Sequence, residues 1–255
     1  MAIFTITYRS DVLKRDITFK ASLPADFYPD EKYRTLYMLH GLNYNYEGWL
    51  KETRFDRLAR DKKFAVIFPD GQNSFYVNGI LPNSAFDRQI CEELVSFTRR
   101  VLPLSDKRED TFIGGFSMGG FGAIRNGLKH ADTFSKILSF SAAIHLFEFE
   151  PGDARRNIVC GEDGVFGPYE EAVVSDKNPA ICLKNLEEKV KDHLSSYPEV
   201  YMVCGLQDNL LDANRSFKEK LEKAGVKLEY HEYEGIHSHE FVAGHLNEAL
   251  DWLLK

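Results

Sequence analysis

The chain opens with two runs in which apolar and polar residues alternate, "AIFTITYRS" at 2–10 and "DITFKASLP" at 16–24. A period of two residues is typical of a β-strand that buries one face, and the short polar stretch between the runs fits a turn. We therefore predict that the chain begins with two antiparallel strands.

Further along, apolar runs of strand length alternate with segments of helical periodicity. Several of these runs are apolar on both faces, as strands are when helices cover both sides of a sheet. The pattern predicts an α/β fold with a mostly parallel central sheet and helices on both faces. The runs are "TLYMLHG" (35–41), "FAVIFPDG" (64–71), "DTFIGGFS" (110–117), "SKILSFSA" (135–142), "EVYMVCG" (199–205) and "KLEYHEYEG" (227–235).

The segments between these runs place apolar residues three and four apart, which predicts helices over 84–101, 118–130, 210–224 and 240–254. In the first of them, the spacing predicts a stripe that faces the core. Its members are Phe86, Ile90, Leu94, Phe97 and Val101.

One segment breaks the alternation. About 50 residues separate "SFSAA" from "EVYMVCG", which is too long for a simple crossover between strands. Long connections of this kind often form caps or binding loops. We therefore predict one α/β domain over residues 1–255, with an inserted cap or binding segment at about 145–180, above the carboxyl edge of the sheet.

Composition and charge narrow the class of protein. The chain is 44% hydrophobic and 28% charged, as ordinary globular proteins are. Its net charge of -7 argues against a surface for nucleic acid or anionic membrane. No stretch approaches the roughly 20 apolar residues of a membrane span, and the N-terminus has no apolar run typical of a secretory signal. We expect a cytoplasmic protein with neither nucleic-acid nor membrane partners.

The cysteines give no sign of metal or redox chemistry. Cys91, Cys160, Cys182 and Cys204 are scattered and never occur as C-x-x-C. In a reducing cytoplasm this pattern favours buried free thiols.

The stretch "TFIGGFSMGGFGAI" at 111–124 surrounds Ser117 with glycines. A phosphate-binding loop would need Lys and then Ser or Thr after its last glycine, and G-x-G-x-x-G is absent as well. What fits is G-x-S-x-G, from Gly115 to Gly119, between a predicted strand and a predicted helix. Glycines on either side allow the strained turn to pack closely. The motif predicts that Ser117 is a nucleophile; the alternative is a glycine-rich contact between helix and sheet.

A serine nucleophile needs a base, and the base needs a carboxylate that orients it. When such a serine lies between a strand and a helix, the acid and the histidine follow it in that order, each after a later strand. The strand at 199–205 is followed by Asp208, and the strand at 227–235 by His237. We predict that Ser117, Asp208 and His237 form a catalytic triad.

Three nearby residues are weaker candidates. Asp212 falls within the following helix, and His231 lies inside a strand pattern, where a half-buried structural histidine is expected. His237 and His239 have the spacing of a metal-binding pair, but the sequence offers no obvious third ligand. We therefore expect no metal.

Hydrolysis through a serine also needs N–H donors for the oxyanion of the tetrahedral intermediate. The turn at Ser117 aims the Met118 N–H and the helix N-terminus at this position. The loop after the strand at 35–41 contains His40 and Gly41, so the Leu42 N–H is predicted to be the second donor. His40 is predicted to shape the loop and not to act in catalysis.

With these residues in place, the chain resembles the esterase D superfamily of α/β-hydrolases, in particular its bacterial tributyrin-esterase branch. The resemblance implies hydrolysis of short acyl esters through an acyl-enzyme, with no metal and no organic cofactor. It also implies a cleft bordered by "NSFYVNG", where Phe75 and Tyr76 either bind substrate or simply pack beneath the loop. The similar blocks are "YMLHGLNYNYEGWLKETRFDRL", "FAVIFPDGQNSFYVNG", "FIGGFSMGGFGAIRNGL" and "VCGLQDNLLDANRSFKEKLEKAGVKLEYHEYEGIH".

The chain departs from the family pattern at two places. Relatives usually follow the catalytic histidine with an acidic residue and tryptophan, whereas His237 is followed by Ser238 and His239. The substrate loop usually carries Gly-Trp-Tyr, and here it reads Ser-Phe-Tyr at 74–76. Neither change touches the predicted triad, but both leave the acyl and alcohol groups of the substrate open.

Together these residues predict a serine carboxylesterase that acts on a small-molecule acyl ester. Three enzymatic alternatives stay open: an S-formylglutathione hydrolase, a deacetylase or feruloyl esterase for acylated sugars, and an acyltransferase. A non-catalytic binding protein on a hydrolase scaffold is the alternative from a different class. The oligomeric state is also open, a homo-oligomer included.

Overall fold

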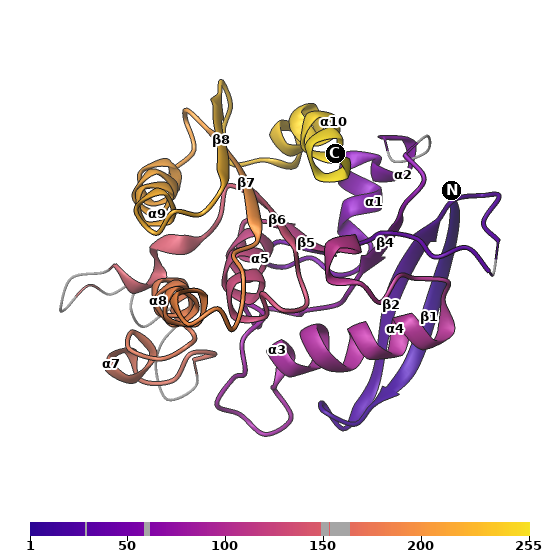
Figure 1. Ribbon diagram of the computed structural model, residues 1–255, viewed down its shortest axis with the longest axis horizontal. Helices are drawn as coiled ribbons and strands as arrows, with labels where there is room; N and C mark the ends of the chain where they lie inside the picture. Colours follow the sequence, from indigo (N-terminus) through magenta and orange to yellow (C-terminus); the bar gives the residue numbers. More distant parts are fainter. Residues whose placement is uncertain (29, 59–61, 149–152, 154–163) are drawn as a thin grey trace.

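The computed structural model describes residues 1–28, 30–58, 62–148, 153 and 164–255. At its centre lies an eight-stranded sheet with the strand order β1-β2-β4-β3-β5-β6-β7-β8 (Figure 1). The described strands are β1 (Ala2–Ser10), β2 (Arg15–Leu23), β3 (Thr35–Leu39), β4 (Ala65–Phe68), β5 (Thr111–Phe116), β6 (Lys136–Phe140), β7 (Glu199–Gly205) and β8 (Leu228–Tyr233).

Helices connect these strands. The α-helices are α1 (Gly48–Thr53), α2 (Phe55–Leu58), α3 (Phe86–Arg88), α4 (Val95–Val101), α5 (Met118–Lys129), α7 (Tyr169–Ala172), α8 (Pro179–Lys191), α9 (Leu211–Lys223) and α10 (His239–Leu254). A π-helical turn, η1 (Gln89–Leu94), joins α3 to α4, and the short 3-10 helices are η2 (Arg108–Asp110) and η3 (Ile144–Phe147).

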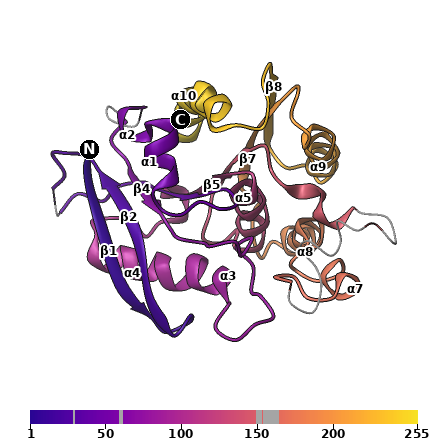
Figure 2. The same cartoon turned by 180° about the vertical axis from the view of Figure 1, so that it is seen from behind.

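The first two strands form the antiparallel pair that the alternating pattern predicts, with Ala2 opposite Leu23. Figure 2 shows them as a long ribbon at one side of the molecule. β2 pairs antiparallel with β4, and from β4 to β8 every pairing is parallel. The predicted mostly parallel sheet is therefore confirmed.

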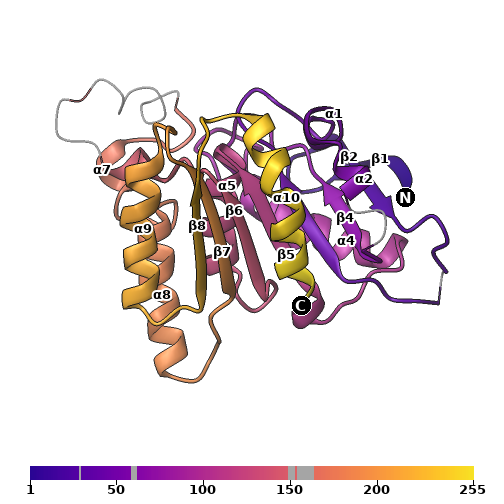
Figure 3. The ribbon, with the colours of Figure 1, turned by 90° about the horizontal axis from the view of Figure 1, so that it is seen from above.

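Helices cover both faces of the sheet. One face packs against α1, α2 and α10, and the other against α5, α8, α9 and the η1–α4 helix (Figures 1 and 3). Every residue of β3, β4 and β5 is buried. This explains why these runs are apolar on both faces, since neither face meets water.

The core stripe predicted over 84–101 is wrong at its end. Leu94 is buried as expected, but Val101 is 51% exposed, and Val95 and Thr98 are buried in its place. The cause is the π-helical turn at Gln89–Leu94, whose wider turn rotates the later residues away from the phase of an ideal α-helix.

The predicted insertion at about 145–180 lies partly outside the described residues, because 149–152 and 154–163 are not described. Within its described part, the Phe166 ring packs against Phe75, Phe121 and Phe147. The helices predicted from the sequence do not include α8, which packs against α5 and begins within the predicted segment. Among the described residues, no helix has both the length and the apolar character of a membrane span.

Candidate active site

Ser117 occupies the turn between β5 and α5, as the G-x-S-x-G motif predicts. Its backbone has φ 57° and ψ -116°, an uncommon conformation for a residue other than glycine. Such strain persists only where the surrounding structure enforces it, and it is concentrated at functional sites. The side chain is partly exposed, so a substrate can reach it.

The glycine two residues after Ser117 allows α5 to approach the end of β3. A Cβ atom on Gly119 would lie 2.2 Å from the Leu39 carbonyl oxygen, closer than real Cβ contacts come. Any larger residue would push the first turn of α5 away from β3. This contact confirms the packing role predicted for the glycines.

The loops after β7 and β8 meet at the carboxyl edge of the sheet. The Gln207 N–H donates to the Gly235 carbonyl oxygen at 3.0 Å, and the Gly235 N–H donates to the Gln207 side-chain oxygen at 2.7 Å. Gly235 has φ 149°, and a side chain there would collide with the Phe241 ring. These contacts hold the loop of Asp208 against the loop of His237.

Three residues predicted from the sequence form one hydrogen-bonded chain. The His237 Nδ1 and the Asp208 carboxylate are 2.9 Å apart, and His237 Nε2 lies 2.9 Å from Ser117 Oγ. Because a carboxylate only accepts, Nδ1 carries the proton and donates. Nε2 is then free to accept from the Ser117 hydroxyl, which is the arrangement a general base requires.

The Asp208 carboxylate is buried behind the imidazole. Burial alone raises its pKa, but the hydrogen bond from His237 and the backbone N–H of Leu210, 2.9 Å from the second oxygen, hold it below its ordinary value. Asp208 is therefore a carboxylate at neutral pH. It can both fix the histidine tautomer and stabilise an imidazolium.

Both predicted oxyanion donors lie beside Ser117. Met118 is the first residue of α5, and a Cβ atom on Gly41, which precedes Leu42, would lie 3.7 Å from Ser117 Cβ. In the described part of the chain, neither the Met118 N–H nor the Leu42 N–H donates to a protein acceptor. Two free N–H groups next to a serine suit an oxyanion. Their catalytic use stays a prediction.

The weaker candidates lie outside this hydrogen-bonded chain. Asp212 is in α9 with its side chain fully exposed, and His231 is half-buried in β8 as predicted. His239 is the first residue of α10, and its ring lies 4.4 Å from the Tyr44 ring and 5.0 Å from the Phe116 ring. Burial lowers the pKa of His239.

A different group of residues has the spacing of a metal site. The ligand atoms of Asp87, Cys91 and His130 lie within 4.8 Å of one another. However, Asp87 also pairs with Arg125 at 2.8 Å and with Lys129 at 2.5 Å. The Asp87 carboxylate is already paired with two positively charged side chains. Asp87, Cys91 and His130 are therefore better suited to linking the segments that carry them than to binding a metal ion.

Phe75 and Tyr76, the predicted substrate-binding residues, belong to the loop that follows β4, and their side chains point into the protein. Phe75 is 7% exposed, and its ring packs against Phe121. Tyr76 is fully buried, and its hydroxyl donates to the His40 carbonyl oxygen at 2.8 Å. Their contact with a substrate stays a prediction.

Two further residues contribute to the site without a sequence signal. The Phe116 ring packs against the His237 ring, with centroids 4.7 Å apart. Phe116 is the variable residue before the serine in G-x-S-x-G, so the motif does not specify it. Gln207 joins the two loops through contacts between distant segments, which no local pattern reveals.

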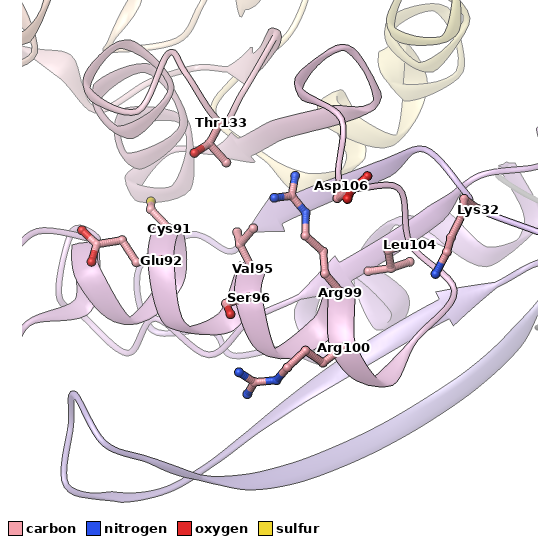
Figure 4. A pocket seen from close by; sticks show the side chains of 10 residues that line it. All are labelled: Lys32, Cys91, Glu92, Val95, Ser96, Arg99, Arg100, Leu104, Asp106 and Thr133. Atoms are coloured by element: carbon pink, nitrogen blue, oxygen red, sulfur yellow. The ribbon is translucent and has the colours of Figure 1, made fainter.

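A cavity of about 500 Å³ lies along η1 and α4, away from Ser117. Figure 4 shows Arg99 and Arg100, which line it, pointing in different directions. Its other lining residues include Lys32, Asp106 and Thr133, which precede β3, β5 and β6. The cavity is thus at the amino ends of the strands, whereas ligands of open α/β sheets bind at the carboxyl ends.

A smaller cavity, of about 230 Å³, is at the carboxyl ends of the strands. It is lined by Gln72, Asn73 and Ser74 after β4, by Ile80 and Leu81, and by Val165 and three further residues. The side chain of Asn73 accepts from the Asn43 N–H at 2.8 Å, so the wall of this cavity is joined to the loop of Leu42.

Comparison with known proteins extends over nearly the whole chain. Residues 10–253 match the family described as "Putative esterase". An acetyl esterase of Caldicellulosiruptor saccharolyticus is 37% identical, and the match covers 100% of this chain and 99% of that protein.

Solved structures give the same picture. The fluorophosphonate-binding serine hydrolase FphF of Staphylococcus aureus is 26% identical with a TM-score of 0.83, over 100% of this chain and 98% of that one. The S-formylglutathione hydrolase FrmB of the same organism is 25% identical with a TM-score of 0.79, over 100% of this chain and 99% of that one.

Proposed function

The chain belongs to the "Putative esterase" family and is a serine carboxylic ester hydrolase; we propose that it removes short acyl groups, above all acetyl, from small-molecule esters. The acetyl esterase that is 37% identical over the whole chain supports this substrate class. The buried aromatic rings of Phe75, Phe121, Phe147 and Phe166, which fill space next to the first turn of α5, favour a small acyl group.

In this proposal Ser117 Oγ attacks the ester carbonyl carbon while His237 Nε2 takes its proton. The oxyanion accepts from the N–H groups of Leu42 and Met118. When the tetrahedral intermediate collapses, His237 gives its proton to the leaving alcohol, and the acyl-enzyme remains. Water then repeats the sequence in place of the alcohol, which releases the carboxylic acid and restores Ser117.

The observation that carries the proposal is the continuous hydrogen-bonded chain from Asp208 through His237 to Ser117, with both links at 2.9 Å. A histidine in this tautomer, directed at a serine in a strained turn, is what nucleophilic catalysis requires. A binding protein would need none of these links.

The direct test is Ser117→Ala, with Ser195→Ala as the matched control. Ser195 lies in the loop before β7, at the amino end of the strands. Ser117→Ala should abolish labelling by a fluorophosphonate probe and lower kcat for p-nitrophenyl acetate by about 10⁴ or more. Ser195→Ala should do neither. Near-normal turnover by folded Ser117→Ala protein would contradict the proposal.

The acyl preference is tested with p-nitrophenyl esters from acetyl to decanoyl. Each methylene that fits adds about 0.8 kcal/mol of burial, whereas one that clashes costs more than it adds. We expect kcat/KM to be highest between acetyl and butyryl and to fall steeply beyond. A value that rises through decanoyl would indicate a long acyl cleft and would overturn the short-acyl assignment.

A second candidate is thioester hydrolysis, favoured by the similarity to S-formylglutathione hydrolase FrmB across both chains. Turnover of S-formylglutathione beside p-nitrophenyl acetate separates the two. We expect the oxyester to be the better substrate by kcat/KM, and the reverse ranking would assign the second function.

Three further expectations belong to the same proposal. We propose that the protein is cytoplasmic and that the segment at about 145–180 covers the cleft as a cap. A homo-oligomer is a further proposed form. Cell fractionation, deletion within the segment and light scattering test them in turn. A shorter segment should change KM for bulky esters more than for acetyl esters.

A further inference from the structure

The backbone between β3 and Leu42 is held by buried side-chain donors. Three successive carbonyl oxygens each accept one hydrogen bond from such a donor. The Trp49 indole donates to Leu39 O at 3.0 Å, the Tyr76 hydroxyl to His40 O at 2.8 Å, and the His40 Nδ1 to Gly41 O at 2.8 Å. All three donor residues are at most 3% exposed. Such complete use of consecutive carbonyls fixes the path of this loop.

The hydrogen bonds of His40 define its tautomer. The Gly71 N–H lies 2.9 Å from His40 Nε2, and a backbone N–H can only donate. Nε2 therefore accepts, and the ring proton is on Nδ1, where it is directed at the Gly41 carbonyl oxygen. The ring thus joins the loop after β3 to the loop after β4.

This bond fixes the direction of the next N–H. The Gly41 carbonyl and the Leu42 N–H belong to one planar trans peptide, so they point in opposite directions. The Gly41 carbonyl points toward the buried His40 ring and also accepts a longer bond from the Tyr44 N–H at 3.3 Å. The Leu42 N–H therefore points away from the His40 ring. A Cβ atom on Gly41 would lie 3.7 Å from Ser117 Cβ, so the peptide that carries the Leu42 N–H is next to this serine.

We propose that His40 and Tyr76 are positioning residues for the oxyanion hole. They touch no reacting atom. His40 holds the Gly41–Leu42 peptide and Tyr76 holds the His40–Gly41 peptide before it, and together these bonds fix the orientation in which the Leu42 N–H serves the oxyanion. The inference rests on the proposed function and deepens it. It also gives Tyr76 a role through its hydroxyl that is separate from substrate contact.

The test for Tyr76 is Tyr76→Phe beside the matched control Tyr37→Phe. Tyr37 is also buried, lies in β3, and its hydroxyl shares a 2.7 Å hydrogen bond with Thr98, away from the Leu39–Gly41 carbonyls. Both substitutions delete one buried hydroxyl and one hydrogen bond, so both should lower the thermal midpoint to a similar extent. Only Tyr76→Phe should lower kcat, by about 10- to 100-fold with little change in KM, because a lost oxyanion donor costs about 10² to 10³.

The test for His40 uses two amides. Asparagine places its side-chain NH₂ near the position of Nδ1 and can still donate to Gly41 O, whereas glutamine reaches the position of Nε2 and can only replace the bond from Gly71. We expect His40→Asn to retain more kcat than His40→Gln, by about tenfold. The rate of fluorophosphonate labelling should follow the same order, since the tetrahedral adduct uses the same N–H donors.

Equal kcat values for Tyr76→Phe and Tyr37→Phe would overturn the inference, as would a loss confined to KM. A higher kcat for His40→Gln than for His40→Asn would show that the link to Gly71 matters and the Gly41 bond does not. If neither His40 variant folds, the tyrosine pair decides. Ser117→Ala keeps the two levels apart: activity that survives it refutes the proposed function, whereas an inactive Ser117→Ala with an unaffected Tyr76→Phe refutes only the positioning role.

Discussion

His237 Nε2 lies 2.9 Å from Ser117 Oγ although 120 positions of sequence separate the two residues. They meet because β5 and β8 belong to the parallel part of the sheet, so the loops that follow them lie at one edge. Figure 3 shows the loop from β8 into α10 at the same end of the strands as α7. The contact between these two side chains therefore follows from the topology of the sheet.

The two neighbouring histidines should differ sharply. His237→Ala removes the proposed base and should lower kcat nearly as much as Ser117→Ala, because the members of a triad act as a unit. His239→Ala removes a ring packed against Tyr44 and Phe116 and should cost at most about tenfold, mainly in KM. Steady-state kinetics with p-nitrophenyl acetate provide the comparison. The opposite ranking would make His239 the base.

Asp208→Asn should leave the geometry intact and still disable the base. An amide can donate to His237 Nδ1, which would move the ring proton to Nε2 and direct it at Ser117, and in a serine protease this change costs about 10⁴ in kcat. Asp212→Asn is the control, since its side chain is fully exposed. We expect a loss of about 10² to 10⁴ for the first variant and none beyond twofold for the second. Equal effects would remove Asp208 from the proposed triad.

Asp87 should make the fold sensitive to acid. Burial raises its pKa, but the hydrogen bond from His130 and the charges of Arg125 and Lys129 hold the pKa well below the ordinary value near 4. A carboxyl with a depressed pKa contributes stability that is complete above its ordinary pKa and is lost as pH falls toward the folded-state value.

Thermal midpoints of the wild type and Asp87→Asn between pH 3 and 7 check this. Near pH 7 the variant leaves Arg125 buried with less compensation and should lose about 3–5 kcal/mol of unfolding free energy. The difference should shrink below about pH 4, where the Asp87 carboxyl of the unfolded wild-type chain begins to protonate while that of the folded protein stays ionised. A difference that stays constant with pH would show that Asp87 contributes through packing alone.

Gly119→Ala and Gly244→Ala should shift stability in opposite directions. A Cβ at Gly119 would meet the Leu39 carbonyl oxygen at 2.2 Å, whereas a Cβ at Gly244, in the exposed face of α10, meets nothing within 4 Å. Gly244→Ala should stabilise by up to about 1 kcal/mol through helix propensity. Gly119→Ala should destabilise and lower kcat, because it displaces the backbone beside Ser117. Denaturant titration and kinetics on both variants measure these effects.

Periodicity predicts most of this fold. Each of the predicted strands has an observed counterpart. β3, β4 and β5 are buried along their whole length and give apolar runs, whereas β1 and β2 give alternating ones. The error at Val101 has a local cause, the π-helical turn at Gln89–Leu94. Such a turn changes the number of residues per turn without changing the composition, so the hydrophobic pattern does not predict it.

The side chains of the proposed triad are predictable from the sequence, whereas the contacts that support the site are less so. Ser117, Asp208 and His237 follow from a motif and the order of strands, and the structure brings them together. The hydrogen bond of Tyr76 to the loop after β3 joins residues 36 positions apart in the sequence. Such contacts depend on the complete tertiary structure, so no spacing of residues in the sequence predicts them.

The proposed donor at Leu42 is a backbone N–H, and its side chain is 43% exposed. Every residue except proline carries the same N–H, so Leu42 can be replaced by any residue other than proline without loss of this donor. Because Leu42 is exposed, its side chain is free to vary in size and charge. A saturation library at this one codon would therefore explore substrate preference while keeping the proposed donor, and the proline variant, which lacks the N–H, should be inactive.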